Sequence, residues 1–339
     1  MKKKPSLKDI AKEVGVSVPL VSYVLGGKGK ENRVSDKTAK KIRDTAKALN
    51  YRPNLNARSL KTNRTKTIGV ILADISNPFF ANLARIIEDE AFSLGYTVIF
   101  GSSDENIRKF DRVLELLLTR QVDGLIIAPP EGSKNTISQL KKQNIPFVLI
   151  DRYFQDLDYN YIVADNFNAS MLATEYLIKK GHKRIATIGY NSSLAHYQDR
   201  YNGYVEGLKT NGIEEDANLV KRVSNNKLKA DMHEAITHLI NVNNATAIYF
   251  QTNTLAEEGL RQLIGLEKDI LAKIDVVVFD QNSTYHFLQN FVPYIDQPIK
   301  KMGYYALKTL IEHINNPDLN TSQLKLPAHL EEEGMRKNN

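Results

Sequence analysis

Three aspartates stand where α/β proteins often hold ligands. Asp74, Asp151 and Asp280 each follow an apolar run typical of a buried strand. Carboxylates at the carboxyl ends of strands can accept hydrogen bonds from ligand hydroxyls. A pair of carboxylates can also hydrolyse a glycosidic bond. Nothing in the sequence sets the separation of Asp151 and Asp280 or perturbs their pKa values, so the pattern favours binding over catalysis.

The sequence does not contain the residue patterns of other catalytic sites or of metal sites. The chain has no cysteine, which excludes disulfides, thiol catalysis and thiolate ligands. His233 and His238 are five residues apart, and no other residue completes a metal-binding spacing. The segment GGKGK, residues 26–30, follows a helical pattern and lacks the full phosphate-loop motif. The sequence therefore predicts no enzyme, no cofactor and no metal site.

Positive charge is concentrated in the first fifth of the chain. Residues 1–66 contain 18 Lys and Arg against 5 Asp and Glu, a net charge of +13, whereas the remaining 273 residues carry −6. This asymmetry predicts a polyanionic partner for the N-terminal segment alone. The segment also has apolar periodicity, which a disordered basic tail lacks.

The chain is expected to be cytoplasmic and to have no membrane partner. The N-terminal residues MKKKPSLKDIAKEVG are basic but run into an amphipathic helical pattern instead of the apolar core of a signal peptide. No window approaches the ~18 uninterrupted apolar residues that a membrane span requires.

Three helices are expected in the first fifty residues. The first begins at Ser6, with Asp9 as its capping-box partner. Ser17 caps the second helix, which places Pro19 in the first turn, where its missing N–H costs nothing. Ser35 caps the third. Two helices joined by a short turn and braced by a third are typical of a helix-turn-helix domain.

From residue 67 the pattern becomes α/β. Near-continuous apolar runs alternate with helical patterns, as in parallel sheets that are covered by helices on both faces. The span is large for one sheet, so we expect two doubly wound α/β subdomains of roughly 100–150 residues each. Ligands of such sheets lie beyond the carboxyl ends of the strands, which favours a cleft between the subdomains.

Motifs along the chain resemble those of LacI/GalR-type transcriptional repressors. They include SLKDIAKEVGVSVPLVSYVL (6–25), IGVILADISNPFF (68–80), VDGLIIAPP (122–130), LIKKGHKRIATIG (177–189) and QPIKKMGYYAL (297–307). The match runs in unbroken order from residue 6 to about residue 315. The resemblance implies a homodimer that binds a palindromic operator in double-stranded DNA and has a core like that of periplasmic sugar-binding proteins.

The resemblance also implies the domain boundaries. Residues 1–53 would form the helix-turn-helix domain, 54–66 a hinge helix or linker, and 67–339 the effector-binding and dimerisation core. Within the core, the N-subdomain would take about 67–163 plus about 295–318, and the C-subdomain about 164–292 plus about 319–330.

The second helix would lie in the DNA major groove. By the resemblance, the DNA-binding residues are Ser6, Leu7, Ser17, Val18, Pro19, Ser22, Tyr23, Ser35, Thr38, Tyr51, Asn54, Ala57 and Leu60. Val18 and Pro19 lack side-chain hydrogen-bonding groups but can contact thymine methyls, unless Val18 packs in the core. Tyr23 stands where many relatives have arginine, so the base preference should differ.

Two further segments bear on DNA binding: the connection that follows this helix and the hinge helix. The connection over residues 26–35, GGKGKENRVS, is longer and more basic than is usual in the family, so contacts from 26 to 33 cannot be transferred. The family's hinge helix, here Asn54–Thr62, orders on the operator and inserts one leucine into the minor groove, which would be Leu60. The cost of partly unstacking a base step is repaid by contacts on the bent duplex.

The effector, by the same resemblance, lies between the subdomains. The residues implied to bind it are Asp74, Phe79, Phe80, Asp151, Asp165, His196, Arg200, Thr252, Asp280 and Gln297. The two phenylalanines would supply an apolar or stacking wall, and Arg200 and the carboxylates would hold hydroxyls by charge-assisted bonds. These groups favour a sugar or sugar derivative over a nucleobase.

Alternative roles remain open for some of these residues. Any of the aspartates could instead cap a helix or form a surface ion pair, and His196 could lie in an exposed loop. Thr252 and Asn253 stand where many relatives have Asn-Asp, and Gln281 replaces a carboxylate pattern, so the identity of the effector cannot be transferred.

The function predicted from these features is a sequence-specific transcriptional regulator, expected to act as a repressor, of carbohydrate metabolism genes. Its effector would shift a two-state equilibrium and so change operator affinity. The alternative is a solute-binding protein of the periplasmic sugar-binding type. Such a protein would have no use for an N-terminal segment with a net charge of +13.

Overall fold

The computed structural model describes residues 5–51, 64–267, 269–288 and 291–332 of the 339-residue chain. Contacts divide the chain into two compact units, residues 1–65 and residues 66–339. We call them the N-terminal unit and the core unit and describe each by itself.

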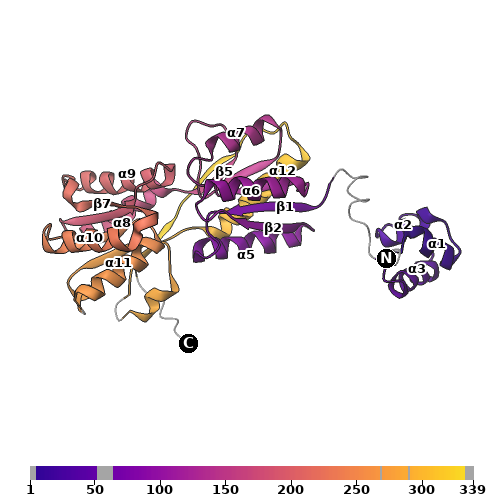
Figure 1. The fold of residues 1–339 in the computed structure, drawn as a ribbon, viewed down its shortest axis with the longest axis horizontal. Helices are drawn as coiled ribbons and strands as arrows, with labels where there is room; N and C mark the ends of the chain where they lie inside the picture. The colour runs from indigo at the N-terminus through magenta and orange to yellow at the C-terminus, as the bar shows by residue number, and fades with distance from the viewer. Residues whose placement is uncertain (1–4, 52–63, 268, 289–290, 333–339) are drawn as a thin grey trace. The chain divides into compact units, whose positions relative to one another are not determined.

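In its described residues, 5–51 and 64–65, the N-terminal unit forms helices at the places that the capping residues predict (Figure 1). They are α1 (Leu7–Val14), α2 (Val18–Leu25) and α3 (Asp36–Ala48). At the start of α1, the Asp9 carboxylate accepts hydrogen bonds from the backbone N and the Oγ of Ser6, at 2.8 and 2.7 Å. One residue from each helix (Ile10, Val21 and Ile42) is fully buried at the centre. The other face of α2 is therefore left for contacts outside the unit.

The core unit is built from two six-stranded sheets. In spatial order, the first sheet contains β11 (Gln323–Leu326), β5 (Tyr161–Ala164), β4 (Phe147–Ile150), β3 (Gly124–Ile127), β1 (Thr67–Leu72) and β2 (Thr97–Ser102). The second contains β12 (His329–Glu331), β10 (Tyr294–Asp296), β9 (Asp275–Phe279), β8 (Ala247–Phe250), β6 (Ile185–Tyr190) and β7 (Val220–Val223). Among these strands only β12 is antiparallel to its neighbour.

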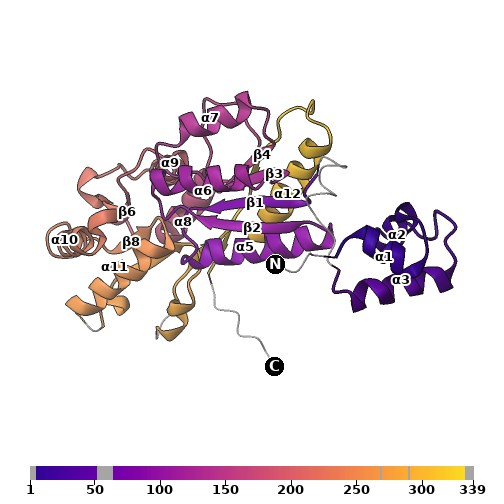
Figure 2. The same ribbon diagram turned by 45° about the vertical axis from the view of Figure 1, so that its right-hand side comes forward.

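Helices cover both faces of each sheet (Figures 1 and 2). On the first sheet, α5 (Pro78–Ser93) and α12 (Ile299–Asn315) lie on one face, and α6 (Ile107–Thr119) and α7 (Lys134–Lys142) on the other. On the second, α8 (Asn166–Lys179) and α9 (Ala195–Thr210) lie opposite α10 (Leu228–Asn241) and α11 (Asn253–Leu266). Short 3₁₀ helices occupy Ala217–Leu219, Asn225–Lys227, Ile270–Ala272 and Ser283–Phe287. The predicted fold class, two doubly wound subdomains after a helical domain, is confirmed.

The apolar strands follow from this double covering. Successive residues of a strand point to opposite faces, so Val70 packs with α5 and α12 while Ile71 packs with α6 and α7. Both residues are fully buried. A strand in this position must be apolar at every residue, which is the pattern that predicted it.

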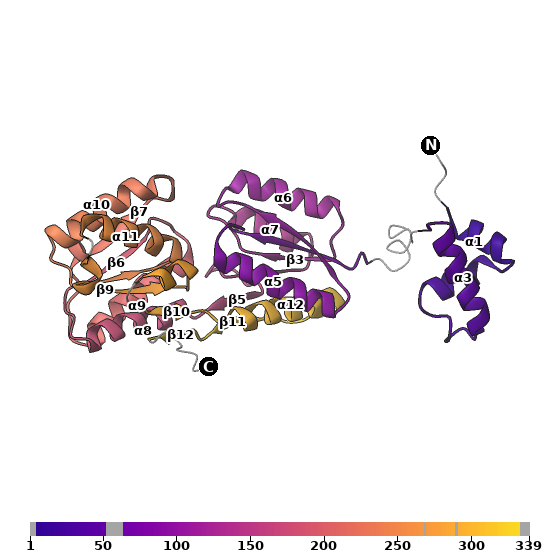
Figure 3. The same ribbon diagram turned by 90° about the horizontal axis from the view of Figure 1, so that it is seen from below.

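The last strands do not divide as expected from the sequence (Figure 3). Residues 295 and 296, expected in the N-subdomain, belong to β10, which pairs with β9 of the second sheet. Residues 323–326, expected in the C-subdomain, form β11 and pair with β5 of the first sheet. Both strands are short, and β11 is an edge strand with no residue fully buried, so neither carries a strong apolar signal. The chain therefore returns to the second sheet just before residue 329 instead of near 319.

No helix in the described part of the chain is long and apolar enough to cross a membrane.

Gly203 sets how closely α9 approaches α8. A Cβ at this position would lie 2.1 Å from the carbonyl oxygen of Phe167, which is backbone and cannot move away alone. We expect Gly203→Ala to lower the free energy of unfolding of the core unit by about 1–3 kcal/mol, because the helices must separate. Urea unfolding followed by circular dichroism measures this change.

Gly265 provides the matched control. It lies in α11, and an added Cβ there would meet no atom within 4 Å. Gly265→Ala should leave the stability unchanged or raise it by up to ~1 kcal/mol, since alanine favours a helix. Equal effects of the two substitutions would contradict the close-approach argument.

Candidate DNA-binding surface and effector cleft

The face of α2 that is not used by the core exposes several of the predicted DNA-binding residues. Ser17, Pro19, Ser22 and Tyr23 are exposed, with 40% of the Tyr23 surface accessible. Val18 is half-buried and packs partly against the core of the unit, which leaves part of its side chain accessible for the predicted DNA contact. Ser17 occupies the N-cap position of α2, but its hydroxyl makes no capping hydrogen bond.

The remaining predicted DNA-binding residues lie around this helix or outside the described residues. Ser35 Oγ accepts a hydrogen bond from the backbone N of Thr38 at 3.2 Å, which starts α3 as predicted. Leu7 and Tyr51 are half-buried against the core of the unit. Asn54, Ala57 and Leu60, and with them the hinge helix, lie outside the described residues.

The core unit contains a cavity of about 340 Å³ at the carboxyl ends of the strands of both sheets. Eight of the ten predicted effector residues line it: Asp74, Phe79, Phe80, Asp151, His196, Arg200, Thr252 and Asp280. The rings of Phe79 and Phe80 pack edge to face, with centroids 5.0 Å apart. Strand ends from the two sheets thus bring together residues that are far apart in the chain.

Two predicted residues do not line the cavity. Asp165 caps α8, where its carboxylate accepts hydrogen bonds from the N and Nδ2 of Asn168 at 3.2 and 2.6 Å. The helix-cap alternative therefore describes its place in the fold. Gln297 is buried behind the cavity wall and donates from Nε2 to Oδ1 of Asp280 at 2.7 Å. It contacts a lining residue and is not itself part of the lining.

The corresponding aspartates of the two sheets share an unusual backbone conformation. Asp151 follows β4 with φ of 67°, and Asp280 follows β9 with φ of 76°. The left-handed region is uncommon for residues other than glycine, although aspartate tolerates it better than most. This conformation ends each strand at the aspartate and is typical of ligand sites held by a rigid scaffold.

Burial sets the protonation of both carboxyls. It raises the pKa of Asp280 to about 7, against the opposing effects of the Arg200 charge and the hydrogen bond from Gln297. Burial also raises the pKa of Asp151, while the neighbouring Arg152 charge opposes the shift. Near neutral pH, Asp280 can therefore either donate or accept a hydrogen bond.

Arg200 is held rigidly in the wall of the cavity. Its Nε donates to Oδ1 of Asn166 at 2.8 Å, and its Nη1 donates to the carbonyl oxygen of Gln251 at 2.6 Å. The guanidinium lies 3.5 Å from the centroid of the Phe279 ring. Such stacking fixes the plane of the guanidinium and the direction of its N–H groups.

A second arginine, Arg152, also lines the cavity and is almost completely buried. Its Nη1 donates to Oε2 of Glu105 at 2.7 Å and its Nη2 to Oε1 at 2.5 Å, a bidentate ion pair. Its Nε lies 3.3 Å from Oδ2 of Asp151. Burial acts to lower the pKa of Arg152, but the hydrogen bonds and charge of Glu105 outweigh it and raise that pKa.

His196 is buried in the cavity wall, so the exposed-loop alternative is wrong. Only 2% of its surface is exposed, and its ring centroid lies 3.9 Å from that of Tyr197. Burial, together with the charges of Arg152 and Arg200, lowers its pKa well below the usual value, so the imidazole is neutral. Its Nδ1 has no hydrogen-bond partner among the described residues, which suits contact with a ligand.

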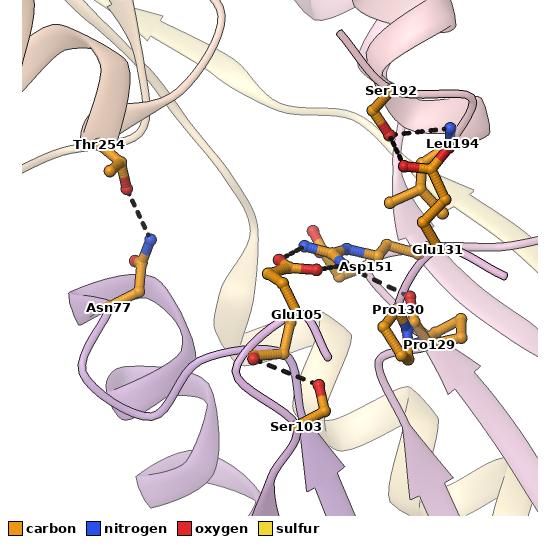
Figure 4. A network of polar contacts seen from close by, with 12 residues as sticks. Asn77, Ser103, Glu105, Pro129, Pro130, Glu131, Asp151, Ser192, Leu194 and Thr254 are labelled. Carbon is orange, nitrogen blue, oxygen red and sulfur yellow. Dashed lines mark hydrogen bonds and ion pairs between the residues drawn. The ribbon is translucent and has the colours of Figure 1, made fainter. Parts of the chain in front are cut away.

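Polar contacts join the two sheets across the mouth of the cavity (Figure 4). Asn77 donates from Nδ2 to Oδ1 of Asn253 at 3.1 Å and to Oγ1 of Thr254 at 3.3 Å. At another point, the Glu131 carboxylate accepts hydrogen bonds from the Oγ of Ser192 at 3.1 Å and the backbone N of Ser193 at 2.9 Å.

Sequence reasoning missed many of the polar and aromatic residues of the lining. These are Asn77, Glu105, Glu131, Arg152, Tyr190, Asn191, Ser192, Tyr197, Ser224, Asn225, Asn226, Asn253 and Thr254. Most of them follow a strand or begin a helix at the same edge as the predicted aspartates. That rule could have found Glu105 after β2 and Arg152 directly after Asp151. Charged residues are also common in loops that line no cavity, so the rule alone is weak.

The raised pKa of Asp280 makes the stability of the core unit depend on pH. A carboxyl whose pKa is higher in the folded state stabilises the fold at low pH, and this contribution is lost as pH rises from about 4 to about 7. We expect Asp280→Asn to become more stable relative to the wild type across this range, by at most ~1.4 kcal/mol per pH unit. Urea unfolding at pH 4.5, 6 and 7.5 measures the difference, and a constant difference would refute the assignment.

Two protein-family models match this chain. Residues 6–54 match the bacterial regulatory proteins of the lacI family, and residues 65–333 match the periplasmic binding proteins and sugar binding domain of the LacI family. The HTH-type transcriptional regulator RegA of Clostridium saccharobutylicum is 32% identical over 327 residues, 96% of this chain and 97% of RegA. The ribose operon repressor of Halalkalibacterium halodurans is 31% identical over 331 residues, 96% of this chain and 95% of that protein.

Solved structures agree with this assignment. The lac repressor dimer bound to operator and the anti-inducer ONPF has a TM-score of 0.81 and 22% identity, covering 97% of this chain and 98% of that one, which supports the fold. A LacI family regulator from Enterococcus faecium with bound ribose has a TM-score of 0.68 and 27% identity, covering 78% and 96%. The two sequence relatives are named as a transcriptional regulator and a repressor, and neither is named as an enzyme. The geometry of the two units and these matches together show that the chain belongs to the LacI family of bacterial regulatory proteins.

Proposed function

We propose that this protein is a cytoplasmic homodimeric repressor of carbohydrate metabolism genes whose affinity for a palindromic operator is set by a sugar. The observation that carries the proposal is the pairing, in one chain, of an exposed helix-turn-helix surface with a polar cleft. A DNA-binding surface and a ligand cleft in one chain are useful together when ligand binding in the cleft changes the affinity for DNA. The names of two relatives, ribose operon repressor and regulator with bound ribose, favour a sugar as the effector.

The chemistry of the cleft favours the same class of ligand. Asp74, Asp151 and Asp280 offer acceptors to hydroxyl groups, while Arg200 and His196 offer groups that bind sugar oxygens. Phe79 and Phe80 provide an apolar wall for the C–H face of a sugar ring. A volume of about 340 Å³ lies at the lower end of the ~300–1,000 Å³ that small-molecule pockets occupy, which suits a small sugar.

Coupling between the sites requires the sugar to bind one state of the dimer more tightly than the other. A difference of ~1–3 kcal/mol would change operator affinity about 5- to 150-fold. The hydrogen bonds of Asn77 and Glu131 across the cleft exist only when the two sheets are close together. A sugar that touches both sheets adds to these bonds and favours the closed cleft, which supplies the required difference.

The rival function, a solute-binding protein without a regulatory role, is not favoured. The N-terminal 66 residues carry a net charge of +13, and α2 exposes Pro19, Ser22 and Tyr23 instead of packing them. A transport protein gains nothing from either feature, whereas a DNA-binding protein needs both.

A thermal-shift screen of neutral sugars, including D-ribose, on the full-length protein tests the effector. We expect at least one sugar to raise the melting temperature and to change operator affinity at least fivefold, measured by fluorescence anisotropy at fixed salt. Arg200→Ala should abolish both effects while operator binding without sugar persists. Sugars that stabilise the protein but leave operator affinity unchanged would rule out the coupling.

Tyr23 tests the DNA-binding surface. Because its side chain is exposed on α2, Tyr23→Ala should weaken operator binding by ~1–3 kcal/mol and leave binding to random DNA nearly unchanged. Lys12→Ala is the control, since this exposed lysine of α1 contributes only to the general positive field. The lysine variant should weaken operator and random DNA alike. Parallel losses in the Tyr23 variant would show that Tyr23 does not read bases.

A further inference from the structure

The guanidinium of Arg152 already holds an anion, and that anion belongs to the protein. We propose that Glu105 occupies the site on Arg152 that a ligand phosphate or carboxylate would otherwise take, and so restricts the cleft to uncharged sugars. Glu105 would thus be a specificity-determining residue that excludes phosphorylated and acidic sugars. This inference rests on the proposed function, since it concerns the effector of the same cleft.

Every nitrogen of the Arg152 guanidinium has an acceptor within the protein (Figure 4). Nη1 and Nη2 donate to the two carboxylate oxygens of Glu105, at 2.7 and 2.5 Å. Nε lies 3.3 Å from Oδ2 of Asp151, and Nη1 lies 3.4 Å from the carbonyl oxygen of Pro129. The two parallel bonds to Glu105 have the geometry by which arginine binds a phosphate or carboxylate. A ligand anion would therefore have to compete for the same two N–H groups.

The position of Glu105 blocks the approach to Arg152. Both residues line the cavity, but the Arg152 side chain is 4% exposed and that of Glu105 is 31% exposed. The carboxylate is therefore the more accessible member of the pair. Glu105 and the preceding Asp104 have φ of 57° and 48°, and the Glu105 N donates to the carbonyl oxygen of Ala73 at 3.1 Å. This fixed turn after β2 holds the carboxylate over the arginine.

The rest of the lining offers no substitute cation. Five carboxylates line the cavity (Asp74, Glu105, Glu131, Asp151 and Asp280), against two arginines and no lysine among the described residues. Arg200, the second arginine, donates from Nε and Nη1 to Asn166 and Gln251, so only part of its guanidinium is open to a ligand hydroxyl. Asp151 and Asp280 lie close enough for their charges to oppose that of Arg200, so it offers no unopposed charge to an anion. An anionic ligand would meet an excess of negative charge, whereas sugar hydroxyls would meet acceptors.

Removing the charge of Glu105 should turn the cleft into an anion site. Glu105→Gln keeps the size of the side chain but places an amide N–H₂ toward the guanidinium, so one arm of Arg152 loses its acceptor. Glu131 provides a matched control because it also lines the cavity but accepts its hydrogen bonds from Ser192 and Ser193. Glu131→Gln changes the charge of the cleft by the same amount and leaves the Arg152 pair intact.

The experiment titrates inorganic phosphate into the full-length wild type, Glu105→Gln, Glu105→Ala and Glu131→Gln by isothermal calorimetry at constant ionic strength. Any binding of phosphate to the basic N-terminal segment is the same in all four proteins. We expect both Glu105 variants to bind phosphate at least tenfold more tightly than the wild type, and Glu131→Gln to stay within twofold of it. Circular dichroism and thermal unfolding of each variant check that its core unit is folded.

Unchanged phosphate affinity in Glu105→Gln would overturn the proposal. An equal gain in Glu131→Gln would also overturn it, because the gain would then reflect net charge and not the site on Arg152. Tighter binding of D-ribose 5-phosphate than of D-ribose to the wild type would do the same. These titrations need no operator and no known effector, so their failure would leave the coupling of sugar and operator to its own test.

Discussion

Parallel pairing is the constraint on which the cleft depends. In each sheet the paired parallel strands end at one edge, so the side chains that follow them gather there whatever their separation in sequence. Two such edges enclose the cavity, which is lined by residues that follow β1, β2, β3, β4, β6, β7, β8 and β9. The positions of the polar lining residues therefore depend on the pairing of the apolar strands that they follow. A slip in strand register would move both together.

The sequence predicted the elements far better than the contacts between them. Fully apolar strands such as β3 and β8 and capped helices such as α1 and α3 have local physical signatures, and all were found. Strands β10 and β11 were misassigned because three or four residues, partly exposed, carry no such signature. Which sheet they join is decided by the path of the chain between two folded subdomains, a long-range property that no local pattern contains.

In the candidate site, too, residues with a local signal were predicted, whereas residues defined by long-range contacts were missed. Asp151 and Asp280 were predicted because they end apolar strands in motifs that resemble those of the LacI family, and the structure adds the left-handed backbone conformation of both residues. Asp165 ends an equally apolar strand but caps α8, and only the three-dimensional path separates the two outcomes. Glu105 went unnoticed because its role depends on Arg152, 47 residues away. Pairing of charges across loops is invisible until the fold brings the partners together.

The buried charges of the cleft are explained better by specificity than by stability. Burying an ion pair costs desolvation that the attraction between the charges often fails to recover, and apolar replacements are frequently no less stable. A cleft that served only to join the two sheets would be better lined with leucine. Here Arg152 and Arg200 are instead held by fixed acceptors, while His196 keeps an unused nitrogen and Asp280 has a pKa near neutrality. Spare hydrogen-bonding capacity in the cleft therefore lies partly with uncharged or easily neutralised groups, an arrangement that discriminates among ligands by their hydroxyls and by their charge.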